Sequence, residues 1–153
     1  MAQSRLTALE ALLGQPLGVS AWLRIDQERI DAFAEATLDR QWIHVDKARA
    51  LAGPFGATVV HGYLSLSLLS HFANDLRVGE LRLSEATTVL NYGLGRVRFL
   101  QPVRAGTRIR DHIRLLALQR RENGLLVTLE HSLELEGETK PALVAETLLL
   151  ILA

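Results

Sequence analysis

The chain has no cysteine, few aromatic residues and no excess of either charge. The absence of cysteine excludes disulfides, thiol catalysis and cysteine-ligated metal sites. Basic and acidic residues number 17 each, so the net charge gives no reason to expect nucleic acid or an anionic membrane as a partner. The N-terminus lacks the basic and apolar segments of a secretory signal, and no apolar run is long enough to span a bilayer. We therefore expect a cytoplasmic protein.

The composition and length are those of one ordinary globular domain. Hydrophobic residues make up 48% of the 153 residues and charged residues 22%. A chain of this length can bury roughly 70% of its unfolded surface around one core. We predict a single domain over residues 1–153, in which residues 1–14 form an N-terminal helical extension that Ser4 caps and Gly14 ends.

Residues 61–76 are the stretch around which the rest is organised. Leucine and phenylalanine recur there at helical spacing, and small serines occupy the other faces in place of lysine or glutamate. A helix that is apolar nearly all round must be buried on most sides. Its first residues, His61 and Gly62, place unpaired N–H groups and a positive dipole end where they can stabilise an oxyanion.

The order of elements indicates an α+β fold. We predict a strand over 19–25, a helix that Asp26 caps and that ends near Leu38, and a short helix capped by Asp46. After residue 76 the pattern changes to strands, which we place at 87–92, 96–100, 107–117, 125–136 and 142–152. Glycines 93 and 95 supply a turn between the first two. The simplest packing lays the apolar helix across one face of an antiparallel sheet, and N-terminal segments or a second subunit cover the remainder.

One hairpin allows its register to be predicted. Odd-numbered residues are apolar in both 109–117 and 125–135, and facing residues must lie on the same side of the sheet. A three-residue loop at 122–124 pairs odd with odd, and it sets Arg110 opposite Glu136 and His112 opposite Glu134. Asp111 and His131 interrupt the inward apolar pattern, and the pattern offers no explanation for them.

Asp39 and His44 are the candidate chemical pair. They are five positions apart, which on an ideal helix places them about 140° from each other. They meet only if the helix ends near Leu38, residues 41–43 run extended and His44 folds back. A carboxylate and an imidazole that face one cavity can hold and deprotonate a water. The alternative is structural, with Asp39 as a turn residue and His44 as the residue before the Asp46-capped turn.

The motif Asp-x-Gln-Trp-Ile-His at 39–44, Gly-Pro-Phe-Gly at 53–56, His-Gly at 61–62 and Asn-Tyr-Gly at 91–93 together resemble the MaoC-like dehydratases. Among these, the chain is most similar to the nodulation-protein-N-like branch, which includes (R)-specific enoyl-CoA hydratases. The resemblance covers roughly residues 15–153. It implies the hot-dog fold, in which an antiparallel sheet wraps around one long helix, and a homodimer with the active site at or near the dimer interface.

The resemblance also implies roles for individual residues. Asp39 and His44 would be catalytic and share the water that adds to a trans-2-enoyl thioester, and the Gly62 N–H would hold the thioester oxygen. We expect four further residues to contact the substrate: Gln41, Ser70, Asn91 and Tyr92. One departure concerns residue 38, which is usually glycine in the family and here is leucine. Either the turn is remade or Leu38 narrows the pocket, since positive φ penalises leucine by ~1–2 kcal/mol.

The expected function is therefore a hydro-lyase acting on acyl-CoA thioesters, without a cofactor beyond the CoA of the substrate. A hot-dog thioesterase is an alternative enzyme, since fold alone does not decide function. A non-catalytic acyl-thioester-binding protein is an alternative from another class. We expect no metal, because His44 and His61 lack a third ligand at a plausible spacing in the sequence. A nucleic-acid-binding role is disfavoured by the balanced charge.

Overall fold

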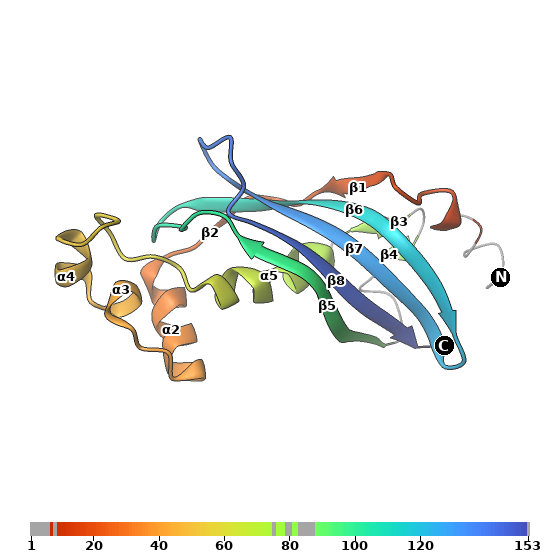
Figure 1. Ribbon diagram of the computed structural model, residues 1–153, viewed down its shortest axis with the longest axis horizontal. Helices are drawn as coiled ribbons and strands as arrows, with labels where there is room; N and C mark the ends of the chain where they lie inside the picture. Colours follow the sequence, from red (N-terminus) through yellow and green to blue (C-terminus); the bar gives the residue numbers. More distant parts are fainter. Residues whose placement is uncertain (1–6, 8, 75, 79–80, 83–87, 153) are drawn as a thin grey trace.

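The computed structural model describes residues 7, 9–74, 76–78, 81–82 and 88–152. Short N-terminal elements precede one long helix, and four long strands complete the chain (Figure 1). The elements are, in order, β1 (Pro16–Val19), β2 (Leu23–Arg24), α2 (Gln27–Thr37), α3 (Trp42–Val45), α4 (Lys47–Leu51), α5 (Gly62–Asn74), β3 (Arg77–Val78), β4 (Leu81–Arg82), β5 (Val89–Phe99), β6 (Arg108–Arg121), β7 (Gly124–Leu135) and β8 (Leu143–Leu152).

The main sheet is antiparallel and curves over α5. Its strand order is β1-β6-β7-β8-β5, and β2 pairs with β6 beyond the end of β1. Figure 1 shows α5 lying against the concave side of the sheet, with α2, α3 and α4 gathered at one end beyond the start of α5. The predicted α+β arrangement of a sheet wrapped around one helix is confirmed.

The core lies between α5 and the sheet. The helix inserts apolar side chains into it, and the predicted helix over 61–76 is confirmed for Gly62–Asn74. The deepest of these are Leu69, Phe72 and Ala73, each at most 4% exposed. The helix is not covered all round, because Tyr63 is 70% exposed and Ser67 and Ser70 also face outward.

The N-terminal predictions are only partly met. Most of the predicted helix within residues 1–14 lies outside the described residues; residues 7, 9 and 10 are helical and residues 11–14 form turns. The single strand predicted over 19–25 is wrong. The chain leaves the ladder after Val19, where Ser20 bonds to Asp111 through both its N–H and its hydroxyl group, and β2 returns for two residues.

The two strands predicted over 87–92 and 96–100 are one continuous strand, β5, so the expected turn at glycines 93 and 95 is wrong. Irregular register at Asn91/Gly93 and Leu94/Val97 absorbs the glycines within the strand. A Cβ atom on Gly95 would lie 2.4 Å from Glu146 Oε2. Glycine therefore leaves room for the Glu146 side chain within the β5–β8 pair, and it does not mark a turn.

The β6–β7 hairpin forms, but in a different register. Arg110 faces Glu134 and His112 faces Ser132, each two residues from the predicted partner. A bulge between Leu115 and Ala117 adds one residue to β6, so a two-residue loop at 122–123 still joins two odd-numbered apolar faces. The outer face is charge-matched, since Arg110 Nε lies 2.7 Å from Glu134 Oε2 and Arg108 pairs with Glu136.

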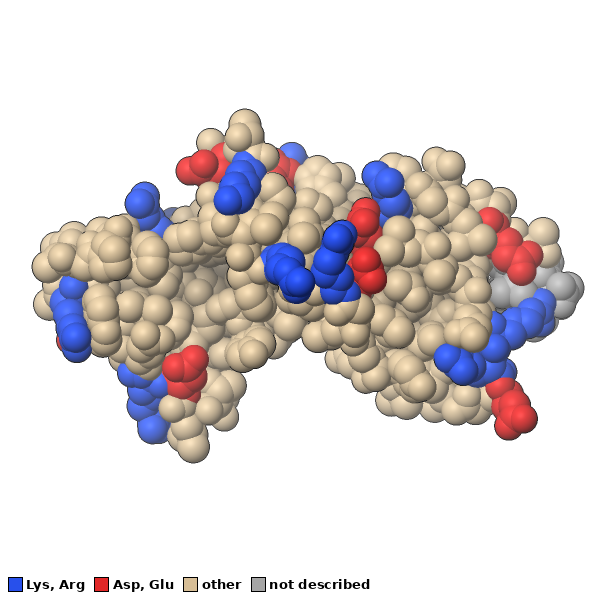
Figure 2. All heavy atoms as spheres, viewed as in Figure 1, with Lys and Arg blue, Asp and Glu red and all other residues tan. Residues whose placement is uncertain are grey.

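Figure 2 shows the charged residues on one face of the molecule. On the face in Figure 2, the described Lys, Arg, Asp and Glu side chains lie in small groups separated by wide uncharged areas. Among the described residues, no helix combines the length and apolar character needed to cross a membrane.

Candidate active site

The turn after α2 places Asp39. Helix α2 begins as predicted, with Asp26 Oδ1 accepting a hydrogen bond from the Arg29 N–H at 3.0 Å. It ends at Leu38, which has φ 63° and ψ 13° and is the one non-glycine residue with positive φ in the described part of the chain. The turn therefore keeps a left-handed conformation of the kind that glycine favours, although residue 38 is leucine. The Leu38 side chain is 70% exposed and lines neither of the two cavities along α5 that are described below.

The short helix α3 positions His44. Residues 42–45 form the single turn α3, so the prediction that residues 41–43 run extended is wrong. Gln41 sits at the N-cap of α3, where its side chain makes no capping bond. The predicted Asp46 cap is confirmed by its bond from the Arg49 N–H at 3.0 Å. Together α3 and α4 turn the chain back, which returns the His44 ring toward Asp39.

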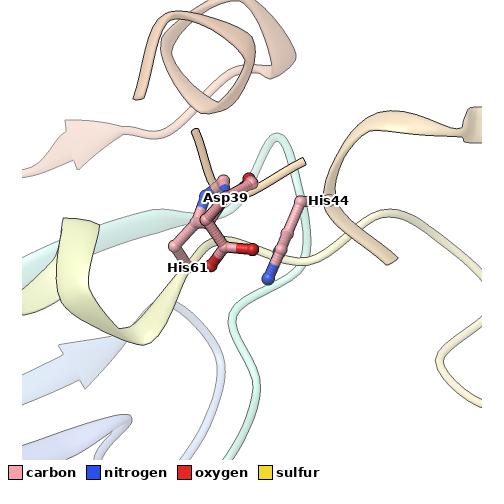
Figure 3. A group of neighbouring side chains, drawn as sticks. All are labelled: Asp39, His44 and His61. Atoms are coloured by element: carbon pink, nitrogen blue, oxygen red, sulfur yellow. The ribbon is translucent and has the colours of Figure 1, made fainter. Parts of the chain in front are cut away.

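Asp39, His44 and His61 form one cluster (Figure 3). A carboxylate oxygen of Asp39 and one ring nitrogen of each histidine lie within 4.8 Å of one another. In Figure 3 the Asp39 carboxylate points toward the His44 ring, with His61 beside both. Asp39 is exposed, whereas His44 is 7% and His61 2% exposed. A gap of this size between two hydrogen-bonding groups accommodates one water.

Backbone carbonyls set the tautomers of both histidines. His44 Nδ1 lies 2.6 Å from the Val59 carbonyl oxygen, and His61 Nε2 lies 2.9 Å from the Asp39 carbonyl oxygen. A carbonyl only accepts, so both of these nitrogens carry a hydrogen and donate it. In the neutral rings, His44 Nε2 and His61 Nδ1 are then the acceptors. His61 Nδ1 is buried and has no hydrogen-bond partner among the described residues.

Burial keeps His44 neutral. It lowers the pKa of His44 from the usual 6.5, and the neighbouring His61 lowers it further; the bond to Val59 and the charge of Asp39 oppose this. The two rings stack with centroids 3.7 Å apart. A neutral imidazole with a free Nε2 is a proton acceptor at neutral pH, which is the state that a general base requires.

The pattern gave no sign that Gln27 supports this site. Its Nε2 donates to the His44 carbonyl at 2.7 Å, and its Oε1 accepts from the Thr58 hydroxyl at 2.5 Å. Thr58 precedes Val59, whose carbonyl holds the His44 ring. One side chain of α2 thus ties α3 to the segment that fixes the tautomer of His44. Gln27 lies on the first turn of a helix, where a glutamine has no distinctive spacing.

Gly62 opens α5 next to this cluster. The N–H groups of Leu64 and Ser65 return to the His61 carbonyl, whereas the first N–H groups of a helix have no partner within it. A Cβ atom on Gly62 would lie 3.1 Å from the Phe99 ring. Glycine therefore lets the aromatic ring pack directly on the helix start.

Two cavities follow α5 on the side of β5 and β8. The proximal cavity, of about 310 Å³, is lined by Gly62 and Ser65 together with Phe99 and Leu143. The distal cavity, of about 280 Å³, is lined by Ser70, Asn91 and Thr147, among others.

The four residues expected to contact substrate are thus dispersed. Ser70 and Asn91 lie together, with Ser70 Oγ 3.4 Å from Asn91 Oδ1, but in the distal cavity. Tyr92 is 58% exposed on β5 and lines neither cavity, and Gln41 is exposed at the start of α3. The structure therefore groups Asp39 and His44 with His61, the residue before Gly62, whereas Gly62 lines the proximal cavity, which neither Asp39 nor His44 lines.

The fold supplies the third potential metal ligand that the spacing lacked, since Asp39 joins His44 and His61. The ring geometry does not suit a shared ion. The two rings are stacked with an interplanar angle of 21°, so their in-plane lone pairs run side by side and do not converge. A tetrahedral site needs nitrogens that point at one centre at about 2.0–2.1 Å.

Comparison with known proteins gives the family. Residues 8–134 match the family described as "MaoC like domain". The chain is 44% identical to nodulation protein N of Rhizobium leguminosarum over 153 residues, covering 99% of this chain and 93% of that protein. It is 41% identical to 3-hydroxyacyl-thioester dehydratase Z of Mycobacterium tuberculosis over 141 residues, covering 92% and 91%.

Solved structures confirm the fold. The (R)-hydratase from A. caviae involved in PHA biosynthesis has a TM-score of 0.72 at 23% identity, covering 91% of this chain and 96% of that one. The monoamine oxidase regulatory protein from Archaeoglobus has a TM-score of 0.76 at 23% identity, covering 92% and 90%. These likenesses establish the hot-dog fold, and the sequence matches establish the family: the chain belongs to the MaoC-like dehydratases.

Proposed function

We propose that the protein adds water to trans-2-enoyl-CoA to give (R)-3-hydroxyacyl-CoA, or catalyses the reverse dehydration. The observation that carries the proposal is the approach of the Asp39 carboxylate to the His44 ring beside the start of α5. Asp39 bonds to His61 through its backbone carbonyl, and His44 bonds to the Val59 carbonyl through Nδ1. The Asp39 carboxylate and His44 Nε2 therefore remain to bind a water. The dehydratase name of a 41% identical relative supports an acyl thioester as substrate.

In the proposed hydration, one water donates one hydrogen to the Asp39 carboxylate and the other to His44 Nε2. Its oxygen forms a bond to C3 of the enoyl thioester as one of these two groups takes its proton. The electron pair of the C2–C3 double bond moves toward the thioester carbonyl oxygen. The electron pair then returns from the thioester oxygen and forms the C2–H bond with the proton that the Asp39–His44 pair took from the water. The pair thus regains its starting state, and one water is consumed for each double bond lost.

Charge that develops on the thioester oxygen needs a donor. The Gly62 N–H is proposed for this role, because it opens a 13-residue helix whose dipole is positive at that end. The proximal cavity beside Gly62 would hold the start of the acyl chain. Removing one such donor typically lowers the rate by ~10²–10³. No metal or separate cofactor has a part in this scheme.

A homodimer is proposed to complete the molecule. β5 is a terminal strand of the main sheet and is 11 residues long, and an edge of that length invites pairing with another strand. Large apolar side chains are exposed on it, among them Leu90, Tyr92 and Phe99, and Tyr63 of α5 contacts Phe99 edge-on. A second copy paired along β5 would cover both the open strand edge and these apolar side chains. Sedimentation should give twice the mass of one chain, and Leu90→Glu should shift the protein toward monomer.

The deciding experiment supplies crotonyl-CoA and longer trans-2-enoyl-CoAs and follows two products. Loss of the conjugated double bond together with (R)-3-hydroxyacyl-CoA supports the hydratase. Release of free CoA thiol without hydration would make the protein a thioesterase. Saturable binding with neither product would make it an acyl-thioester-binding protein.

A further inference from the structure

Asp111 and His131 form a second acid–imidazole pair, inside the sheet. Asp111 Oδ2 lies 2.6 Å from His131 Nδ1, and the two side chains are 0% and 1% exposed. Asp111 lies between Ile109 and Ile113 on β6, and His131 between Leu129 and Leu133 on β7; these four side chains are at most 2% exposed. Asp111 Oδ1 has no hydrogen-bond partner among the described residues. Such a polar pair in an apolar core needs an explanation.

The outer nitrogen of the pair reaches a cavity. His131 Nε2 lies 2.8 Å from Thr147 Oγ1, and Thr147 lines the distal cavity with Ser70 and Asn91. A chain of hydrogen bonds thus runs from the interior of the sheet to the wall of a space of about 280 Å³. The proposed hydration chemistry uses none of these groups.

The number of protons that the Asp111–His131 pair holds decides which atom donates in each of these hydrogen bonds. A net negative charge in so apolar a setting is costly, so the pair holds two protons and is neutral overall. One proton lies between Asp111 and Nδ1, whichever of them owns it, and the other must be on Nε2. Nε2 therefore donates to Thr147 Oγ1, and the Thr147 hydroxyl hydrogen is left to donate to another acceptor. Burial raises the pKa of Asp111, which favours a protonated pair.

The distal cavity lies farther along the same helix and strands than the proximal one. Facing residues Phe99 and Leu143 both line the proximal cavity, and facing residues Leu94 and Thr147 both line the distal one. From Leu143 to Thr147 the strand advances about 13 Å, at about 3.3 Å per residue. Along α5, the eight residues from Gly62 to Ser70 span about 12 Å. The two cavities thus lie one after the other beside α5, β5 and β8, and an acyl chain whose thioester is at Gly62 would extend toward the distal one.

We propose that the Thr147 hydroxyl, held as a donor by the buried Asp111–His131 pair, recognises an oxygen atom near the far end of the acyl chain. The substrate class is then an acyl-CoA of medium length with a hydroxyl or carbonyl oxygen distant from the thioester. This inference rests on the proposed function, because the direction of the acyl chain follows from placing the thioester at Gly62. Thr147 is a specificity residue in this account and takes no part in the hydration step.

The test measures binding, so it does not depend on turnover. Saturated acyl-CoAs of eight, ten and twelve carbons are each compared with the ω-hydroxy form of the same length by calorimetric titration. The quantity of interest is the ratio of the two dissociation constants. Thr147→Val removes the donor at nearly constant shape, and Thr147→Ser keeps it as the matched control.

At the best-fitting length, the ratio should shift against the ω-hydroxy ligand by about three- to tenfold in Thr147→Val, the usual worth of one neutral hydrogen bond. Thr147→Ser should keep the wild-type ratio, and the unsubstituted ligand should bind all three proteins alike, which also reports an intact fold. Equal ratios in wild type and Thr147→Val at every length would overturn the proposal. Hydration of crotonyl-CoA by the same preparations separates the two ideas, because a four-carbon chain does not reach the distal cavity.

Discussion

The described part of the chain contains two aspartate–histidine pairs, and they differ in which atoms remain free. At Asp39 and His44, the structural bonds use the Asp39 backbone carbonyl and the His44 Nδ1, so the carboxylate and Nε2 face one another across a gap. At Asp111 and His131 the carboxylate bonds directly to the ring at 2.6 Å. The first arrangement has room for a water and the second has none. Residue type is the same in both, so the free atoms decide which pair can do chemistry.

The largest expected difference between the pairs concerns activity. Asp39→Asn should lower kcat/KM for crotonyl-CoA by about 10³-fold, since positioned proton transfer contributes 10²–10⁴. Its free energy of unfolding should change by less than about 0.5 kcal/mol, because Asp39 is exposed. Steady-state kinetics and urea unfolding measure the two effects. Unchanged turnover would remove Asp39 from the proposed chemistry.

The reverse pattern is expected for the buried pair. Asp111→Ala should lower the free energy of unfolding by about 3 kcal/mol, because it leaves His131 buried without its partner. Hydration of crotonyl-CoA, assayed under conditions where the variant is folded, should stay within a few-fold of wild type. The measurement is urea unfolding beside initial rates. A stable variant with abolished activity would invert the assignment of the two pairs.

The pairs should also differ in how pH acts on them. The pKa of His44 is lowered in the folded protein, so the unfolded chain binds the proton more readily. The stability that His44 contributes is therefore present above about pH 6.5 and is lost as the pH falls below it. Burial raises the pKa of Asp111, so ionisation of Asp111 acts with the opposite sign, costing stability as the pH rises.

The same shift of His44 has a kinetic consequence. If neutral His44 is the base, kcat/KM should stay flat down to below pH 6.5 and fall only on the acid side of that value. A pH series of initial rates measures this limb. A limb at or above pH 6.5 would show that the titrating group is not a buried, destabilised imidazolium.

The smallest expected effect concerns the turn that presents Asp39. Leu38→Gly should raise the free energy of unfolding by about 1 kcal/mol, because glycine adopts positive φ without the penalty that leucine has. Leu38 is 70% exposed, so little packing is lost. Thermal unfolding should shift upward by about 2–4 °C. A downward shift would mean that Leu38 stabilises the turn through contacts.

Much of the fold was predictable because local signals were strong. The caps at Asp26 and Asp46 and the apolar run of α5 depend on neighbouring residues, and each was confirmed. Long-range geometry was not predictable in the same way. The glycines of β5 and the bulge of β6 are set by neighbouring strands, so Gly95 resembled a turn residue and Arg110 was paired with the wrong glutamate.

The candidate site likewise has a part that local sequence signals predicted and a part that they did not. Asp39 and His44 were predicted from the motif, and the structure brings them together beside His61, which precedes the predicted Gly62. Gln27 and the Asp111–His131–Thr147 chain were not assigned a role, because their partners lie on elements distant in sequence. Hydrogen-bond direction depends on which carbonyl each ring faces, and no spacing in a sequence encodes that.

The most direct test of the central claim, that Asp39 and His44 act on one shared water, is a double-mutant cycle on kcat/KM for crotonyl-CoA. The four proteins are wild type, Asp39→Asn, His44→Gln and the variant with both changes. Two groups that act as a unit give strongly non-additive losses, so the double variant should be no more than a few-fold slower than the slower single variant. Losses that multiply would contradict the shared water and show that the two side chains act independently.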